Sequence, residues 1–418
     1  MKSMNYYIID ALAPLVFRSG KPFGAQAAAS DANIPLPSSS AGLMRSQYMR
    51  THQIALSENG EQNRGTLKKK DYEKLLDIAT FGNLLVRFPI DHPQDFTIMV
   101  PKPSNAMYLK EKSSAQSDES QVAETVLVRL APAIKSNDDD SEYGTDLPNG
   151  LQLVQMTQSL KGKPQKGANF WCLDDFMAWQ SGKDLTFDAV SKNGLESIPI
   201  DVRTHVAIND TSLSSEDGQL FQTAGLDTAA KAQPHHAGWD ENQLGFLTGI
   251  TESIDTTNPS AKQPDTLVRF GGEGRLSKMI TVTNEATTTL APPVKLNQHI
   301  KDAGGICVTL LTPAIFSAGY LPAWLDNTTL EGVFPHSATR VRLKAAAVDR
   351  WQPVSGWDLQ QYKPKAMRKA TPAGSVYWFE LLDDCCDIES AWLMALSDDL
   401  QDQRDGFGIA TIHPWQQV

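Results

Sequence analysis

A run of basic and aromatic residues carries the clearest chemistry in this 418-residue sequence. Between residues 340 and 369 eight bases outnumber two acids, for a local charge of +6. The bases are Arg340, Arg342, Lys344, Arg350, Lys363, Lys365, Arg368 and Lys369, and the interleaved aromatic residues are Trp351, Trp357 and Tyr362. Proteins hold single-stranded RNA with cations on its phosphates and rings under its bases. The pattern predicts such a track, and the alternative is a solvated basic face beside buried tryptophans.

A glycine-rich loop is the second place where phosphate could bind. Gly271, Gly272 and Gly274 lie between two strand-like runs, and the cations Arg275 and Lys278 follow at once. Glycine adopts positive φ without steric cost, so bare backbone amides beside two cations can cradle phosphates. The alternative is a hairpin bulge with a purely structural role.

Three serines at residues 38–40 mark the third candidate. They follow a loop rich in Ala, Ser and Pro and are typical N-caps for a helix that begins near Ala41. The start of a helix presents amide hydrogens that attract anions. Gly42 and Arg45 belong to the same segment.

The motifs of common catalytic and cofactor sites are absent from the sequence. It contains no P-loop, zinc-protease, nucleophile-elbow or EF-hand pattern. Residues 406–410 imitate the start of a dinucleotide fingerprint, but only eight residues follow, too few for the unit it requires. The only histidine pair, His235 and His236, lacks a third ligand nearby. We therefore predict no metal, no cofactor and no catalytic residue.

The net charge argues against a nucleic-acid partner, but its distribution weakens that objection. Two acidic runs, residues 137–146 and 380–402, carry −5 and −8 of a net charge of −11, which leaves +2 for the rest. Such runs are typical of solvated loops or of surfaces that contact other proteins.

Composition and cysteine usage favour a folded cytoplasmic protein. Hydrophobic residues make up 41% of the chain and charged residues 21%. The four cysteines form no CxxC pair, which indicates reduced thiols. The uncharged run 304–325 is interrupted by Pro313, Gly319 and Pro322, so it predicts a buried strand at 306–311 and no membrane span.

The elements that would position these residues follow no regular alternation of strand and helix. Strands are expected at 6–18, 84–89, 96–101, 126–134, 198–208, 219–221, 243–251, 267–284, 306–311, 341–348 and 375–381, and helices from 41 and at 71–81, 170–180, 295–303 and 388–400. This order favours an α+β fold. The length suits two domains, and we place the boundary near residue 195.

Nine segments, read in order, resemble one family: the third RAMP subunit of the Cmr module, the type III-B CRISPR effector of antiviral defence. They are residues 14–18, 20–24, 38–45, 203–208, 218–221, 271–275, 354–359, 372–377 and 406–408. His413 and Pro414 depart from the family pattern, which usually has another glycine in the closing loop.

The resemblance implies two ferredoxin-like (RRM-like) RAMP domains with loop insertions, residues 1–195 and 196–418, the second carrying the glycine-rich loops. It implies a subunit that holds the 5′ tag of the guide RNA, catalyses nothing itself, and joins the large polymerase-like CRISPR subunit to a backbone RAMP subunit. The RNA-binding residues expected are Arg18, Lys21, Ser38, Ser39, Ser40, Gly42, Arg45, Gly271, Gly272, Gly274, Arg275, Lys278, Arg350, Trp357, Lys365, Arg368, Lys369, Gly406 and Gly408.

Two other functions stay open on the sequence. A RAMP endoribonuclease would process guide RNA precursors without metal, by acid and base catalysis that requires a well-placed histidine. A scaffold would join two other proteins through its acidic surfaces without contacting RNA.

Overall fold

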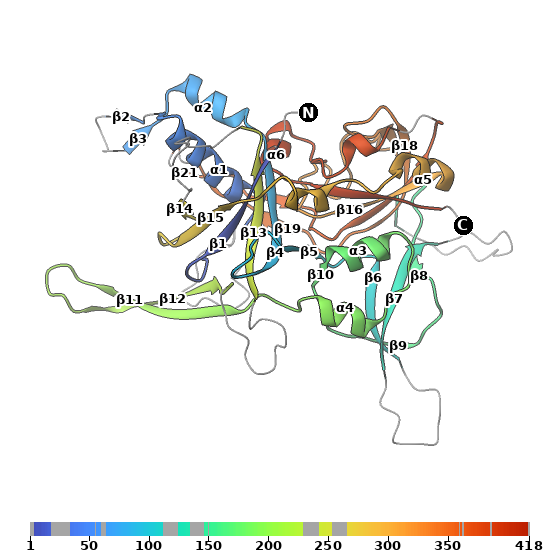
Figure 1. Ribbon diagram of the computed structural model, residues 1–418, viewed down its shortest axis with the longest axis horizontal. Coiled ribbons are helices and arrows are strands. Elements are labelled where there is room, and N and C mark those ends of the chain that lie inside the picture. Colours follow the sequence, from blue (N-terminus) through green and yellow to red (C-terminus); the bar gives the residue numbers. More distant parts are fainter. Residues whose placement is uncertain are drawn as a thin grey trace, which may run out of the picture.

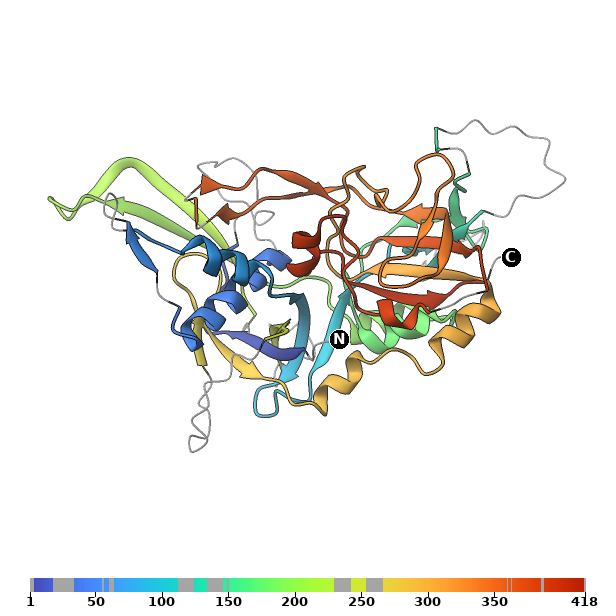
Figure 2. The ribbon, with the colours of Figure 1, turned by 90° about the horizontal axis from the view of Figure 1, so that it is seen from above.

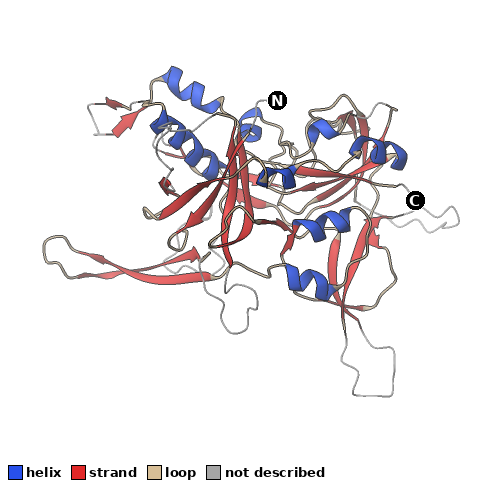
Figure 3. Ribbon diagram, in the orientation of Figure 1, coloured by secondary structure: helices blue, strands red, loops and turns tan. Residues whose placement is uncertain are grey.

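The computed structural model has an α+β fold with two antiparallel sheets that lie side by side (Figures 1 and 3). It describes residues 4–17, 34–54, 56–59, 64–111, 124–133, 146–148, 150–228, 242–252, 266–358, 360–361, 363–384 and 387–416. Within the two main sheets every described strand pairing is antiparallel. The α+β class predicted from the sequence is confirmed.

Seven strands form the first sheet, in the order β10-β5-β4-β13-β1-β15-β14. Their bounds are β1 (Asn5–Ala11), β4 (Thr80–Pro89), β5 (Thr97–Pro101), β10 (Phe170–Cys172), β13 (Asn242–Ile250), β14 (Thr266–Arg269) and β15 (Leu276–Thr281). Successive residues of a strand face opposite sides of the sheet. Ile9 accordingly packs in the core with Met44 of helix α1 (Pro37–Thr51), whereas Ile8 packs in a second core with Trp171. Helix α2 (Lys69–Leu76) adds Leu75 to the first core.

Five strands form the second sheet, in the order β17-β18-β23-β16-β24. Their bounds are β16 (Gly305–Leu310), β17 (Glu331–Val333), β18 (Arg340–Ala347), β23 (Val376–Leu381) and β24 (Ala410–Pro414). All six residues of β16 are buried, which explains why this run has no charged residue. Helix α5 (Leu296–Ala303) supplies Leu296 and Ile300 to the same core.

Smaller elements surround the two sheets. A four-stranded sheet has the order β8-β7-β6-β9, from β6 (Ala106–Glu111), β7 (Thr125–Pro132), β8 (Val154–Met156) and β9 (Gly162–Pro164), beside helices α3 (Leu173–Gln180) and α4 (Phe187–Asn193). Further small elements are the strand pair β2 (Ser57–Asn59) and β3 (Arg64–Thr66), the 3-10 helices η2 (Ala286–Leu290) and η3 (Glu389–Ala391), and helix α6 (Leu400–Arg404).

A long two-stranded ribbon, residues 200–226, extends away from the body of the molecule (Figures 1 and 2). We call it the arm; it consists of β11 (Ile200–Ile208) and β12 (Ser215–Leu226). Its exposed apolar side chains include Val202, Val206 and Leu220, and Val206 pairs with Leu220 across the two strands. Directly paired residues lie on the same face of a ribbon. The arm therefore presents an apolar face to solvent.

The two main sheets meet where two glycines approach each other. A Cβ on Gly406 would overlap the backbone of Gly82 in β4, and a Cβ on Gly82 would lie 2.8 Å from the Gly406 carbonyl oxygen. Gly408, with φ of 85°, leaves no room for a Cβ beside the backbone nitrogen of Ser397. Both C-terminal glycines are buried. They serve close packing in the structure, and the RNA contact expected of them stays a prediction.

The helix expected at residues 388–400 is not formed. Leu393 has a positive φ of 55°, which interrupts a right-handed helix. Asp398 accepts hydrogen bonds from the backbone amides of Ser317 and Ala323, at 2.7 and 2.8 Å, and so holds this stretch against a loop of the second sheet. Only η3 and α6 are helical in this region.

Several other boundaries shift by a few residues. Helix α1 begins four residues earlier than expected, with Pro37 at its first position and no side-chain hydrogen bond at its N-cap, Leu36. The serines at 38–40 therefore lie inside the first turn. Strand β1 ends at Ala11, and residues 170–172 form a strand paired with β5 before α3 begins.

The predicted domain boundary near residue 195 falls inside the first sheet. Strands β13, β14 and β15 come later in the sequence, yet they complete that sheet. Strand β13 lies between β4 and β1, so its pairing depends on partners far away in the sequence. The change from the first sheet to the second falls between Thr281 and Gly305.

In the part of the chain that the structure describes, we found no helix long and apolar enough to cross a membrane. Cys172 and Cys307 are buried free thiols. Burial raises the pKa of Cys172 to about 11 and that of Cys307 to about 12. Cys385 and Cys386 lie outside the described residues.

Candidate nucleic-acid interface

The C-terminal part of the basic run folds as an exposed ribbon in two parts, residues 351–370, which we call the basic ribbon. In it β19 (Gln352–Val354) pairs with β22 (Arg368–Ala370), and β20 (Trp357–Asp358) pairs with β21 (Lys363–Pro364). Trp351 and Trp357 are 49% and 54% exposed, so these two rings do not fit the alternative of buried tryptophans. Tyr362 lies outside the described residues.

The inner face of the basic ribbon packs on the body of the protein. Val354 and Ala370 are buried in one cluster with Phe407. Arg368 pairs with Val354 in the strand register and donates hydrogen bonds of 2.7 Å to both carboxylate oxygens of Asp402. These bonds raise the pKa of Arg368. Burial raises the pKa of Asp402, and the bonds from Arg368 reduce that rise without cancelling it. Arg368, expected to bind RNA, is thus engaged in fixing the ribbon to α6.

The other end of the basic ribbon is fixed to the segment before α2. The side-chain amide of Gln360 accepts a hydrogen bond from the Leu67 amide at 3.1 Å and donates one to the Leu67 carbonyl at 2.9 Å. Asp358 accepts hydrogen bonds from the backbone amides of Gln360 and Gln361, which fixes the turn. The ribbon is therefore held at both ends, although Trp351, Trp357 and its lysines are exposed.

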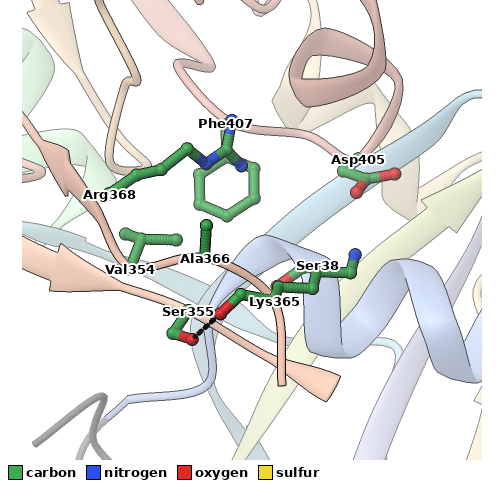
Figure 4. A pocket seen from close by; sticks show the side chains of 8 residues that line it. All are labelled: Ser38, Val354, Ser355, Lys365, Ala366, Arg368, Asp405 and Phe407. Atoms are coloured by element: carbon green, nitrogen blue, oxygen red, sulfur yellow. Dashed lines mark hydrogen bonds between the residues drawn. The ribbon is translucent and has the colours of Figure 1, made fainter. Parts of the chain in front are cut away.

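A hollow of about 210 Å³ lies between the basic ribbon and the start of α1. We call it the junction hollow. Its lining residues are Ser38, Val354, Ser355, Lys365, Ala366, Arg368, Asp405 and Phe407. Figure 4 shows Ser38 of α1 together with Ser355 and Lys365 of the ribbon among the side chains that line the hollow. Two of the three predicted regions, the first turn of α1 and the basic run, thus meet at one place.

The charged residues of the junction hollow differ in whether they have an ion-pair partner. Arg368 is paired with Asp402, and Asp405 is paired with Arg45 at 2.6 Å. The ammonium of Lys365 has no ion-pair partner among the described residues, and its side chain is exposed. Lys365 is therefore the cation of the hollow that is available to an anion.

Arg45 has a structural role that the sequence did not indicate. Its guanidinium donates hydrogen bonds to Asp405 and to the Ile78 carbonyl oxygen, at 2.6 and 3.0 Å, and its side chain is only 11% exposed. Ser40 is fully buried. Gly42 is exposed, and a Cβ there would meet no atom within 4 Å. Of the predicted residues in α1, Ser38 is the one that lines the hollow.

The glycine-rich loop joins β14 to β15 and bends toward the end of the segment that follows β1. Gly271 and Gly274 have φ of 86° and 66°, as the sequence predicted for a tight loop. The Gly272 amide donates to the Val16 carbonyl oxygen at 2.8 Å. Arg275 pairs with Glu273 at 3.0 Å, and Lys278 is half-buried within β15. Arg18 and Lys21 lie outside the described residues.

Two further predicted cations lie at the base of the basic ribbon. The Lys369 ammonium lies 5.2 Å from the centroid of the Trp351 ring. Arg350 is exposed beside a second hollow of about 290 Å³, which Lys102 also lines. Lys102 donates to the Ala106 carbonyl oxygen at 2.6 Å, and burial lowers its pKa.

The described histidines do not gather at one site. His52 caps the C-terminal end of α1, and its ring stacks on Tyr48 with centroids 3.9 Å apart. His413 is buried in β24, and burial lowers its pKa to about 3. No cluster of three or more His, Cys, Asp or Glu that could hold a metal was found within the described ranges, and His235 and His236 lie outside them.

The RNA-binding residues expected from the sequence do not include Phe407 or Ser355, and Trp351 was predicted only as one of the aromatic residues of the basic run. Phe407 lies between the two glycines at 406 and 408, is buried with Val354 and Ala370, and lines the junction hollow. Ser355 and Trp351 flank β19. The register of β19 with β22, which the sequence does not show, determines the face of the ribbon on which the residues between them lie. An alternation of bases and aromatic residues was the signal available for Trp351.

A match over nearly the whole chain defines the class of this protein: residues 7–415 match the family model of a CRISPR-associated protein. The chain belongs to the Cas_Cmr3 family. The resemblance to a Cmr subunit predicted from the sequence is confirmed, and the role at the 5′ end of the guide stays a prediction.

Solved structures that resemble the chain include two of one complex. They are the Type III-B Cmr-beta complex bound to cognate target RNA, and the same complex bound to cognate target RNA and AMPPnP in state 1. Each matched chain is 15% identical with a TM-score of 0.43, and the match covers 89% of this chain and 86% of the other. No curated protein sequence matches significantly.

Proposed function

We propose that the chain is a non-catalytic subunit of a type III-B CRISPR effector complex and binds the single-stranded 5′ tag of the guide RNA. The observation that carries the proposal is the junction hollow, which Ser38 of α1 and Lys365 of the basic ribbon both line. A helix start and an exposed ammonium both favour a phosphate. Membership of the Cas_Cmr3 family supports a role in a CRISPR complex.

The acidity of the chain does not oppose this proposal, because much of the second acidic run is used internally. Asp402 is paired with Arg368, Asp399 accepts from the first amides of α6, and Asp398 accepts from Ser317. These carboxylates make hydrogen bonds or ion pairs within the fold, and Asp402 among them is buried. The exposed charge of the basic ribbon comes mainly from Lys363, Lys365 and Lys369.

Two ferredoxin-like (RRM-like) RAMP domains are our proposal for the finer architecture. Each would contain one of the two main antiparallel sheets with its helices. The division would then lie between β15 and β16, since strands after residue 195 complete the first sheet. The junction hollow would lie where the two domains meet.

The arm supports a role in an assembly. Exposed apolar side chains that gather on one face are typical of protein–protein contact sites. Leu220 is 63% exposed on a ribbon that projects beyond the body. We propose that the chain contacts the large polymerase-like CRISPR subunit and a backbone RAMP subunit, and that the arm belongs to one of these two contacts.

The metal-independent endoribonuclease is the alternative to a non-catalytic role. The described histidine nearest in sequence to the first turn of α1 is His52, at the other end of that helix. We expect no specific cuts when the chain is incubated with a repeat-containing precursor RNA. Cuts that disappear in His52→Ala would establish the endoribonuclease instead.

The proposal is tested by changing the available cation. Lys365→Glu should lower affinity for single-stranded RNA by at least about tenfold, since a charge-assisted contact is worth roughly 1.5 to 3 kcal/mol. The slope of log affinity against log salt should fall by about 0.7, the value for one phosphate on a single strand. Lys192→Glu, an exposed lysine on α4, is the matched control. Equal losses in the two variants would contradict the proposal.

A further inference from the structure

The outer face of the basic ribbon differs in chemistry from its inner face. In the antiparallel register Gln352 pairs with Ala370 and Val354 with Arg368, so these side chains share the inner face. The pair between them, Pro353 with Lys369, must point outward. Trp351, two residues before Pro353, lies on the same outer side.

Trp351 and Lys369 form a defined unit on this outer face. The Lys369 ammonium lies 5.2 Å from the indole centroid, within the range of a cation–π contact. About half of the indole surface nevertheless stays in solvent, and Met367, two residues before Lys369, is 56% exposed. A tryptophan that contacts a cation, and whose indole ring is half exposed, offers a flat surface on which another aromatic ring can stack.

The charged residues of the ribbon indicate which class of ligand fits this face. Lys363, Lys365 and Lys369 are exposed. Asp358 is occupied by the amides of its own turn, and Asp402, which pairs with Arg368, is buried. A ligand that combines a flat ring with a negative charge satisfies both the indole and the lysines. Nucleotides have this combination, and stacking of bases on aromatic rings beside cations is how single strands are held.

We propose that the outer face of the basic ribbon is a stacking site for one base of a single-stranded RNA, with the base on Trp351 and the adjoining phosphate at Lys369. The proposal rests on the proposed function, because it takes RNA as the ligand. It adds a second contact point, on the opposite face of the ribbon from the buried Val354 and Ala370. It also narrows the stacking that the basic and aromatic run predicted to one ring, Trp351, and one cation, Lys369.

The test uses the full chain and a short single-stranded RNA in which one adenine is replaced by 2-aminopurine, whose emission falls when it stacks. The substitution is moved along the RNA one position at a time. At one position emission should fall on binding to the unchanged chain. Trp351→Ala should restore that emission and weaken binding by about 5- to 150-fold, the range for one stacked base. Trp351→Phe keeps a ring and should retain most of the quenching.

An abasic RNA separates stacking from charge. Removal of the base at the quenched position should make Trp351→Ala and the unchanged chain bind alike, whereas Lys369→Gln should still weaken binding and reduce the salt slope by about 0.7. If RNA binds but Trp351→Ala changes neither emission nor affinity, the stacking site is wrong and the proposed function stands. If the unchanged chain binds no RNA, both are wrong. Loss of a protein subunit from the assembled complex in Trp351→Ala, with RNA binding intact, would assign this face to a protein partner.

Discussion

The guanidinium of Arg45 lies 2.6 Å from the carboxylate of Asp405, and this ion pair connects helix α1 to the turn after α6. Asp405 also lines the junction hollow, and α6 carries Asp402, which holds the basic ribbon through Arg368. The same short helix therefore positions both walls of the hollow. The site depends on contacts between segments more than 350 residues apart in the sequence.

Arg45→Ala should destabilise the fold. It would leave the Asp405 carboxylate, 8% exposed, without its ion-pair partner. Loss of one partner of a buried pair costs about 3 to 5 kcal/mol. Urea unfolding should report this loss, while Arg50→Ala, an exposed arginine on the same helix, should change stability by less than about 0.5 kcal/mol. Normal stability together with selective loss of RNA binding would restore the contact role predicted for Arg45.

Gly274→Val should destabilise the glycine-rich loop through backbone strain. Gly274 has φ of 66°, where a β-branched residue costs on the order of 1 to 3 kcal/mol. The space around it is open, so Gly274→Asn, which tolerates this conformation, should be close to neutral. Melting temperature and RNA affinity should be measured for both variants. If Asn weakens RNA binding as much as Val does, the loop is a contact surface, and strain is not the cause.

The strands and helices with strong local patterns were predictable from sequence, and the site was only partly so. The uncharged run at 306–311 is a strand because burial on both faces excludes charge. The pattern around Leu393 looked helical, but its positive φ and the bonds of Asp398 are set by a distant loop. In the same way the basic run was visible in the sequence. The ion pairs of Arg368 with Asp402 and of Arg45 with Asp405 were not, because they depend on the position of α6. The sequence shows which residues are charged. Tertiary packing determines which of these charged side chains are paired within the fold and which are available to a ligand.

Stability should fall as the pH is lowered below about 6.5, because His413 is buried in its neutral form. Its folded pKa is about 3, below the ordinary 6.5, so the unfolded chain binds a proton that the folded chain does not. The contribution is complete above pH 6.5 and is lost at about 1.4 kcal/mol per pH unit below it. Melting curves between about pH 7 and pH 5 measure this slope. His413→Phe should flatten that slope, and an unchanged slope would exclude His413 as its source.

Charges on the apolar face of the arm should weaken assembly without unfolding the chain. Val206 and Leu220 pair on that face and are largely exposed, so the double change to Asp costs little core packing. We expect fewer partner CRISPR subunits to be recovered with the tagged chain from its native complex. Ser212→Asp, in the turn of the arm, is the control. Equal recovery from both variants would show that the apolar face is not an interface.

The central claim, that this chain holds the 5′ tag of a guide RNA, is tested most directly by competition. Affinity should be measured for RNA with the host's repeat-derived 5′ tag and for a scrambled RNA of equal length, with the unchanged chain and with Lys365→Glu. We predict that the tagged RNA binds more tightly and that Lys365→Glu lowers its affinity by at least about tenfold. Equal affinity for the two RNAs, unaffected by Lys365→Glu, would contradict the account.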